Sequence, residues 1–180
     1  PYLILATIPA ALVGVFFKDQ VSDFHHHGQW VGYCLLGTGL LLITGLLSPK
    51  TPTAYKDMGW RMALAMGLAQ ALAILPGFSR SGLTIMTGIF LGLERTAAAR
   101  FSFLMAVPVI SGAGVLACAD LIHHNPPTRE LILNYGFGFL AALISGFVSL
   151  VFLMKLLDGR RFFLFGFYCI TLAFIAILWF

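Results

Sequence analysis

Long apolar runs separated by short charged links most restrict how this chain can fold. The runs are about 15–25 residues long, and roughly 20 apolar residues let a helix cross the hydrocarbon core of a bilayer. The composition agrees, because 59% of the residues are hydrophobic and 10% are charged, against about 45–50% and 25% in a soluble domain. Lipid offers the backbone no hydrogen-bond partners, so segments that face it must be helical. The sequence therefore predicts an all-α, polytopic integral membrane helical bundle.

A single transmembrane domain covering residues 1–180 is expected. Its spans are predicted at 2–17, 29–48, 101–122, 131–157 and 162–180. Pro1 stands directly before apolar residues, with no initiator Met and no basic segment ahead of it. We therefore expect the sequence to be part of a longer protein.

The segment 60–93 differs from these spans because Pro76 interrupts it. About sixteen residues precede the proline and about twelve follow Gly82, which gives helices of roughly 24 Å and 18 Å at 1.5 Å per residue. Neither comfortably crosses a core of about 30 Å. The simplest geometry is a re-entrant hairpin whose tip turns at membrane depth; the alternative is two short spans joined by an exposed turn. Irregular backbone at that depth lines a protein or water-filled cavity, so a functional site is expected here.

The distribution of Lys and Arg predicts the orientation. Lys18 and Arg129 stand alone in their links, whereas other links carry more charge: Lys50, Lys56 and Arg61; Arg95 and Arg100; Lys155, Arg160 and Arg161. The positive-inside rule places the heavier links in the cytoplasm, so the hairpin tip points toward the outer face. Two short spans in place of the hairpin would put every link on the same side of the membrane, so the charges do not distinguish the two. The net charge of +4 is explained by anionic lipid headgroups and needs no nucleic acid as partner.

The hairpin loop carries the residues of an anion site. An arginine at membrane depth costs roughly 2.5–3.5 kcal/mol on insertion scales, so it needs a partner or a function. Arg80 has no acidic residue within thirteen positions on either side. Arginine suits bidentate contact with a phosphoryl group. The alternative is a plain turn in which Arg80 pairs with an acid elsewhere in the fold.

The neighbours of Arg80 are groups that an anion requires. Ser79 and Ser81 carry hydroxyls, and the N–H groups of Ser81, Gly82 and Leu83 are expected at the positive end of a helix. Gly77 and Gly82 allow the backbone to approach a ligand. Thr84, one turn further, adds a hydroxyl and begins a small-residue stripe, Thr84, Gly88 and Gly92, expected to press on another helix.

Two other groups carry less information. The run His25-His26-His27 is expected to be a solvated loop, because consecutive histidines do not share a helical face and no Cys or Glu accompanies them. Cys34, Cys118 and Cys169 lack CxxC spacing and are expected to be buried small hydrophobes. No metal site is predicted within this chain.

Three stretches together carry a family resemblance. They are Gln70-Ala71-Leu72-Ala73-Ile74-Leu75, then Pro76-Gly77-Phe78-Ser79-Arg80-Ser81-Gly82, and Phe101-Ser102-Phe103-Leu104-Met105-Ala106-Val107-Pro108. The chain resembles the undecaprenyl-diphosphate phosphatase family, the bacitracin-resistance type, and corresponds to its C-terminal two-thirds. The resemblance implies a bacterial plasma-membrane enzyme that hydrolyses undecaprenyl diphosphate to the monophosphate carrier of cell-wall synthesis. It also implies two inverted repeats, each with a re-entrant hairpin, and an active site open to the outer face.

The resemblance also implies site residues. Ser79 and Arg80 correspond to the active-site serine and arginine, and Gln70, Ser81 and Thr84 are neighbours in the pocket. Arg80 would neutralise the charge on the transferred phosphoryl group. Ser79 could be a nucleophile or a hydrogen-bond donor, and the donor role is favoured because no base stands beside it in the sequence.

The chain departs from the family in its acidic residues. The family's other hairpin carries a Glu-x-x-x-Glu stretch and a Pro-x-Ser-Ser-x-Gly-His loop, which supply carboxylates for a divalent cation, Mg or Ca, and a catalytic histidine. Here the only glutamates are Glu94 and Glu130, both in links. The N-terminal repeat is therefore expected to be missing, and this chain alone to be inactive. A polyprenyl diphosphate, the bilayer and optionally a second copy of the chain are the expected partners.

Two alternative functions remain open at this stage. A secondary transporter or channel for an anion also uses broken helices whose N-termini point at the anion. A purely structural membrane subunit is the third interpretation.

Overall fold

All regular elements in the described part of the chain are helices. The computed structural model describes residues 2–16, 28–45, 58–124, 128–158 and 162–179. The helices are α1 (Tyr2–Phe16), α3 (Gly28–Thr44), α4 (Trp60–Leu72), α5 (Arg80–Phe90), α6 (Arg95–His124), α7 (Arg129–Asp158) and α8 (Leu164–Trp179). The predicted all-α class is confirmed. The histidine run at 25–27 and the basic residues Lys18, Lys50, Lys56, Arg160 and Arg161 lie outside the described residues.

Two of these helices are long and apolar enough to cross a membrane. They are the stretches Arg95–Leu121 in α6 and Glu130–Leu157 in α7. Three shorter apolar helices accompany them, at Tyr2–Phe16, Gln29–Thr44 and Leu164–Trp179. Large side chains such as Phe137 and Phe147 on α7 are 70% and 68% exposed, far more apolar surface than a soluble monomer leaves to water. The chain is therefore a helical membrane protein.

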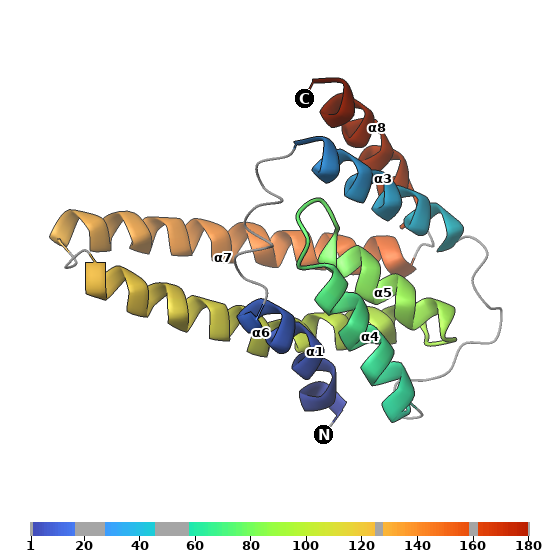
Figure 1. Ribbon diagram of the computed structural model, residues 1–180, viewed down its shortest axis with the longest axis horizontal. Coiled ribbons are helices and arrows are strands. Elements are labelled where there is room, and N and C mark those ends of the chain that lie inside the picture. The colour runs from blue at the N-terminus through green and yellow to red at the C-terminus, as the bar shows by residue number, and fades with distance from the viewer. Residues whose placement is uncertain (1, 17–27, 46–57, 125–127, 159–161, 180) are drawn as a thin grey trace.

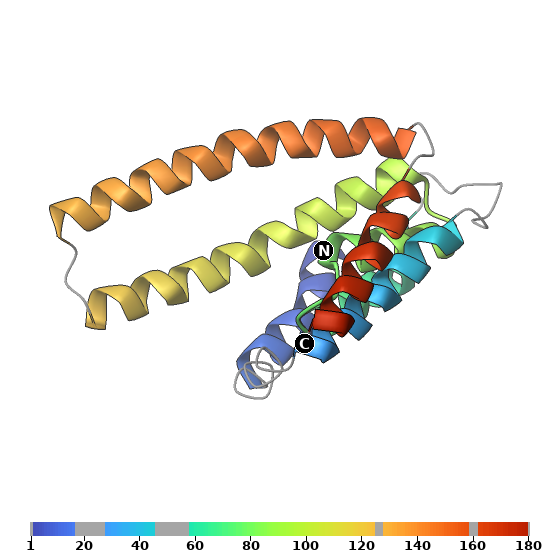
Figure 2. The ribbon, with the colours of Figure 1, turned by 90° about the horizontal axis from the view of Figure 1, so that it is seen from above.

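The helices form a packed group from which one long pair extends (Figure 1). α4 lies against both α1 and α5, α5 lies against α6, and α3 pairs with α8. The far halves of α6 and α7 reach beyond the other helices (Figure 2). Cys118 in that part of α6 is exposed, which corrects the expectation that all three cysteines are buried. Cys169 is buried, and Cys34 is partly exposed.

Glycines let α3 and α8 pack backbone against backbone. A Cβ added at Gly39 of α3 would lie 2.8 Å from the carbonyl oxygen of Gly166, and one added at Gly166 of α8 would lie 2.7 Å from that of Gly39. Gly32, two turns before Gly39, lies against the side chain of Ile177 in α8. In α4, Gly67 lies against the backbone of Ala6 in α1. Close approach at small residues is how membrane helices associate without a hydrophobic driving force.

The core lies between α4, α5 and α6. Met66, Ile85, Met86, Phe101 and Met105 are each at most 1% exposed. The predicted small-residue stripe on α5 is correct at its first two members, because Thr84 meets Ser102 and Gly88 faces Ala98 of α6. Gly92 lies past the end of α5, where it takes a φ of +92° and turns the chain toward α6.

The segment 60–93 is a helix–loop–helix, as predicted, but its helices have different ends. α4 stops at Leu72 and the chain continues through Leu75 in short-range turns. α5 begins at Arg80, two residues before the predicted start, because Ser79 caps it. The helices contain 13 and 11 residues, so they are about 20 Å and 17 Å long.

Candidate functional site

The hairpin loop is anchored on α3. Gly77 has a φ of +97°, which L side chains rarely adopt, and a Cβ there would collide with the backbone of Val31. The N–H of Ser79 donates to Oγ1 of Thr38 at 3.1 Å, and Thr38 is fully buried. The close approach that Gly77 permits within the described residues is to α3, and its expected role at a ligand stays a prediction.

Ser79 is the N-cap of α5. Its Oγ accepts a hydrogen bond from the N–H of Gly82 at 3.2 Å, and its carbonyl oxygen accepts from the N–H of Leu83 at 2.8 Å. Of the three N–H groups expected to face an anion, those of Gly82 and Leu83 are thus used inside the helix. The first-turn N–H of Ser81 has no intrahelical acceptor. The hydroxyl proton of Ser79 also remains available, because an N-cap oxygen only accepts.

Arg80 is held by an uncharged partner. Oε1 of Gln70 on α4 accepts from Nε of Arg80 at 3.0 Å and also from Nη2. Gln70 is only 1% exposed. An arginine has five N–H donors, and contacts among the described residues use two of them, both to Gln70. Among the described residues no carboxylate pairs with Arg80; the acidic residues Asp19, Asp23 and Asp57 lie outside them.

Nε2 of Gln70 is a buried donor with no hydrogen-bond partner in the described part of the chain. Because the guanidinium group can only donate, Oε1 must be the atom that faces Arg80, which fixes the amide orientation. A buried unpaired donor costs about 1–3 kcal/mol. The site therefore contains a polar group that a ligand oxygen could satisfy.

Thr84 does not face the loop. It is fully buried, and its Oγ1 lies 2.8 Å from the carbonyl oxygen of Arg80 and 2.6 Å from Oγ of Ser102 on α6. These contacts tie the first turn of α5 to α6; the role of Thr84 as a third hydroxyl for the ligand stays a prediction. Ser102, within the Phe-Ser-Phe stretch, is its buried partner.

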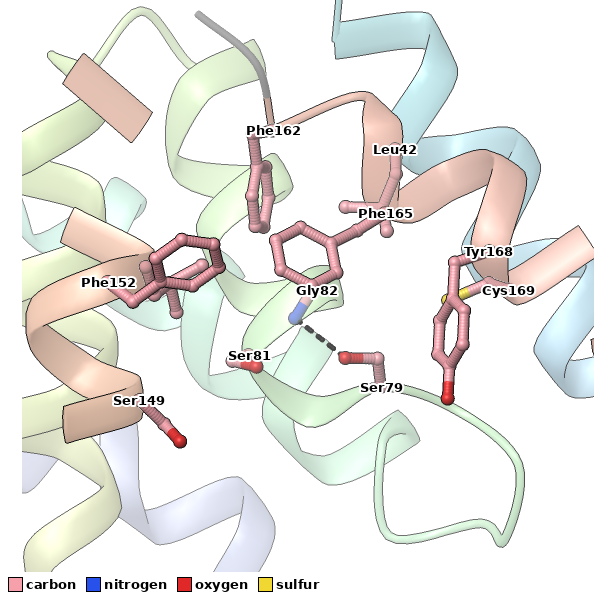
Figure 3. Close-up of a pocket in the computed structure, with 11 residues that line it drawn as sticks. Leu42, Ser79, Ser81, Gly82, Ser149, Phe152, Phe162, Phe165, Tyr168 and Cys169 are labelled. Carbon is pink, nitrogen blue, oxygen red and sulfur yellow. Dashed lines mark hydrogen bonds between the residues drawn. The ribbon is translucent and has the colours of Figure 1, made fainter. Parts of the chain in front are cut away.

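A cavity of about 430 Å³ lies beside the N-terminus of α5 (Figure 3). Ser79, Ser81 and Gly82 border it, and the facing walls come from α7, α8 and the residues just before α8. Its aromatic lining is Phe152, Phe162, Phe165 and Tyr168. Arg80 and Gln70 do not line it. Of the predicted site residues, Ser79, Ser81 and Gly82 therefore border the cavity, whereas Arg80 and Gln70 contact each other outside it.

Comparison with known proteins identifies the family. The family described as "Bacitracin resistance protein BacA" matches residues 1–175. The chain belongs to this family.

The relatives of this bacitracin-resistance chain are named undecaprenyl-diphosphatases. One, from Methanothermobacter thermautotrophicus, is 41% identical over 176 residues, which cover 95% of this chain and 94% of the relative. A second, from Methanosphaera stadtmanae, is 35% identical, with 98% of this chain matching 62% of the relative. Undecaprenyl-diphosphatase 1 of Bacillus cereus is 37% identical, with 98% matching 65%. The chain therefore spans less than two thirds of the second and third relatives and nearly the whole of the first.

The donor groups of this family member suit an anion rather than a metal ion. Hard divalent cations bind carboxylate and carbonyl oxygens, whereas the loop presents a guanidinium group, hydroxyls and a backbone N–H. Within the described residues no group of three or more His, Cys, Asp or Glu is placed to hold a metal. These residues do not fit the divalent cation that the family resemblance implied.

Thr38 and Ser102 are site-supporting residues that the sequence did not reveal as such. Thr38 meets Ser79 from 41 positions away, and Ser102 meets Thr84 from 18 positions away. Both are single hydroxyls within apolar helices. An isolated buried hydroxyl in such a helix is a signal for an interhelical hydrogen bond.

Proposed function

We propose that this chain binds the diphosphate of an undecaprenyl-diphosphatase substrate. The reaction is hydrolysis of undecaprenyl diphosphate to undecaprenyl phosphate and phosphate, which returns the lipid carrier to cell-wall synthesis and underlies bacitracin resistance. The proposal rests on one observation: Arg80, the first residue of α5, lies next to Ser79 and is held by hydrogen bonds to the uncharged Gln70. Family membership and the names of the relatives support it.

The proposed chemistry is electrostatic. Hydrolysis of a diphosphate spreads negative charge over the transferred phosphoryl group, and catalysis is mostly positioning and charge stabilisation. The free N–H groups of Arg80, the N–H of Ser81 and the hydroxyl of Ser79 would donate to phosphate oxygens. Nε2 of Gln70 is a further donor that a bound oxygen would satisfy.

We assign Ser79 the role of donor. Its Oγ is already engaged by the N–H of Gly82, and no histidine or carboxylate among the described residues hydrogen-bonds to Ser79 to take its proton. A nucleophilic serine needs an adjacent base. Groups outside the described residues would activate the water and hold any divalent cation. The described residues are therefore expected to bind substrate without hydrolysing it.

We also propose that the hairpin is re-entrant. Its helices, about 20 Å and 17 Å long, are shorter than a hydrocarbon core of about 30 Å, and its loop packs against the apolar helix α3. The placement of the basic links favours a cytoplasmic entry and a site that opens to the outer face.

Phosphate release from undecaprenyl diphosphate by the full-length protein in detergent tests the function. Arg80→Ala should lower turnover about 10²-fold, the usual cost of losing one preorganised donor to developing charge. Arg100→Ala is the matched control, because Arg100 is exposed on α6. Equal turnover in Arg80→Ala and the parent protein would refute the assignment.

Anion flux into liposomes without hydrolysis would favour the transporter alternative. We also propose that two copies of the chain can form a homodimer. The mass of the protein–detergent complex in the same preparation tests this.

A further inference from the structure

The N-terminus of α5 has both hydrogen bonds of a capping box, but one of them comes from another helix. In a capping box the N-cap side chain accepts from the N–H of residue N3, and the N3 side chain accepts from the N–H of the N-cap. Ser79 makes the first bond, because its Oγ accepts from the N–H of Gly82 (Figure 3). Gly82 is residue N3 and has no side chain for the second bond. Oγ1 of Thr38 on α3 accepts from the N–H of Ser79 instead.

Thr38 lies next to the place that an N3 side chain would occupy. A Cβ added at Gly82 would lie 3.4 Å from Cγ2 of Thr38 and 3.0 Å from Oγ of Ser79. An ordinary capping box has Glu or Gln at N3, and a glutamate there would place a negative charge near Arg80. The hydroxyl of Thr38 completes the cap without adding a charge.

The hydroxyl of Thr38 is itself held in one orientation. Its Oγ1 donates to the carbonyl oxygen of Cys34, one turn earlier on α3, at 3.1 Å. The hydroxyl proton is thus used within α3, and the oxygen accepts from the N–H of Ser79 at 3.1 Å. Thr38 is fully buried, where an N–H that lost its acceptor would be costly. The backbone of Ser79 is therefore held in place by Thr38.

The hairpin loop follows one face of α3. Gly77 lies against Val31 and Cys34, and Ser79 bonds to Thr38. These three residues of α3 are spaced i, i+3 and i+7, so they share one side of the helix. Ser79 has a φ of −78° and a ψ of 109°, the extended conformation that an N-cap needs. One rigid element thus sets the position of the loop and of the N-cap.

We infer that Thr38 is a positioning residue for the hydroxyl of Ser79. This inference rests on the proposed function, in which that hydroxyl donates to a phosphate oxygen. Thr38 holds the N–H of Ser79, and the N–H of Gly82 holds its Oγ. The hydroxyl proton can then move only by rotation about the Cβ–Oγ bond, so the donor is oriented before substrate arrives. A preorganised donor stabilises developing charge without reorganisation during the reaction.

Steady-state phosphate release from undecaprenyl diphosphate by the full-length protein in detergent tests this role. Thr38→Val keeps the shape of the side chain and removes the acceptor. It should lower kcat about tenfold, less than the loss of about 10²-fold or more that follows removal of a whole donor. The KM should change less than about twofold, because the hydrogen bonds between Arg80 and Gln70 are untouched.

Thr38→Ser and Thr44→Val are the matched controls. Thr38→Ser keeps the hydroxyl and should retain kcat within about threefold of the parent, since only the restriction by the methyl group is lost. Thr44 lies on the same helix, and its Oγ1 donates to the carbonyl oxygen of Leu41 at 2.7 Å. Thr44→Val should change neither kcat nor KM. Thr38→Ala, with a smaller side chain and no acceptor, takes the place of Thr38→Val if that variant does not fold.

A double-mutant cycle with Ser79→Ala separates positioning from a purely structural role. When the hydroxyl of Ser79 is already absent, Thr38→Val should lower kcat by at most about twofold, because the group that it positions is gone. Equal losses of kcat from Thr38→Val with and without Ser79→Ala would overturn the inference. A Thr38→Ser protein as slow as Thr38→Val would overturn it too, since the hydroxyl would then not be the group that acts.

The outcomes distinguish this inference from the proposed function. The parent kcat in Thr38→Val, together with a large loss in Arg80→Ala, overturns the positioning role and leaves the diphosphate site standing. Parent-like turnover in Arg80→Ala overturns the proposed function, and this inference with it.

Discussion

Gln70 and Arg80 are joined by two hydrogen bonds to one oxygen: Oε1 of the buried glutamine accepts from both Nε and Nη2 of the arginine. The arrangement orients the guanidinium group without cancelling its charge. A carboxylate in the same place would form an ion pair and compete with any anionic ligand. A neutral partner is therefore suited to an arginine that must bind a phosphate.

The exchange Gln70→Glu tests this requirement. Glutamate has nearly the same shape and can accept the same two bonds, but it places a negative charge beside Arg80. We expect the KM for undecaprenyl diphosphate to rise about tenfold or more, because the added charge repels the diphosphate. Steady-state phosphate release measures this change.

The matched control is Gln29→Glu, the same charge change at an exposed glutamine of α3. It should leave the KM unchanged. A Gln70→Glu protein with the parent KM would show that the charge of Arg80 does not act on the substrate.

Substitutions of Ser79 separate its capping role from its donor role. Ser79→Ala should lower the free energy of unfolding by about 1 kcal/mol, whereas Ser79→Gly should lower it by only a few tenths, because glycine is a better N-cap than alanine. Both remove the hydroxyl, so both should lose similar amounts of turnover. Thermal unfolding and phosphate release distinguish the two effects.

The size of the loss at Ser79 distinguishes donor from nucleophile. A lost donor should cost about 10–10³-fold in kcat, with measurable activity remaining in both variants. Complete loss of turnover, or a phosphorylated Ser79 trapped during the reaction, would contradict the donor role.

Local signals in the sequence predicted much of the hairpin. Pro76 and the short apolar runs around it gave a helix–loop–helix in 60–93, which the structure contains. The predicted start of the second helix was wrong by two residues, although Ser79 is a preferred N-cap residue. That shift placed Gly82 and Leu83 inside the helix and used their N–H groups.

Contacts between distant residues could not be predicted in the same way. The residues around Arg80 predicted an anion site, with an acidic partner as the alternative, and only the family resemblance placed Gln70 nearby. The two hydrogen bonds from Arg80 to Gln70 depend on how α4 packs against α5. Gly77 was predicted to let the backbone approach a ligand, and no local pattern showed that a glycine is also required there by its contact with Val31 of α3. The cavity combines residues from α3, α5, α7 and α8, so no local pattern reveals it.

The hydroxyl pair of Thr84 and Ser102 predicts a stability effect rather than a binding effect. Thr84→Val keeps the shape but leaves Ser102 without its partner, which should cost about 1–3 kcal/mol of unfolding free energy. Pyrophosphate affinity should change little, because Thr84 is fully buried. Chemical denaturation and calorimetric titration provide the two measurements.

The double variant Thr84→Val, Ser102→Ala is the control for this pair. Removing both hydroxyls should recover part of the lost stability, since no buried polar group is then left unpaired. Strictly additive losses in the double variant, or a large loss of pyrophosphate affinity in Thr84→Val, would contradict the structural role.

The contact of Gly39 with Gly166 predicts that a single methyl group will separate α3 from α8. Gly39→Ala places a Cβ 2.8 Å from a backbone oxygen that cannot move alone, so we expect a loss of about 1–3 kcal/mol, typical of overpacking. Gly146→Ala on α7 is the matched control, because nothing lies within 4 Å of its added Cβ and alanine favours a helix. Thermal unfolding in detergent should therefore show a lower midpoint for Gly39→Ala and an equal or higher one for Gly146→Ala. Since α3 also anchors Ser79 through Thr38, Gly39→Ala should weaken substrate binding as well. Equal thermal-unfolding midpoints for the two variants would show that the α3–α8 contact does not hold this part of the fold together.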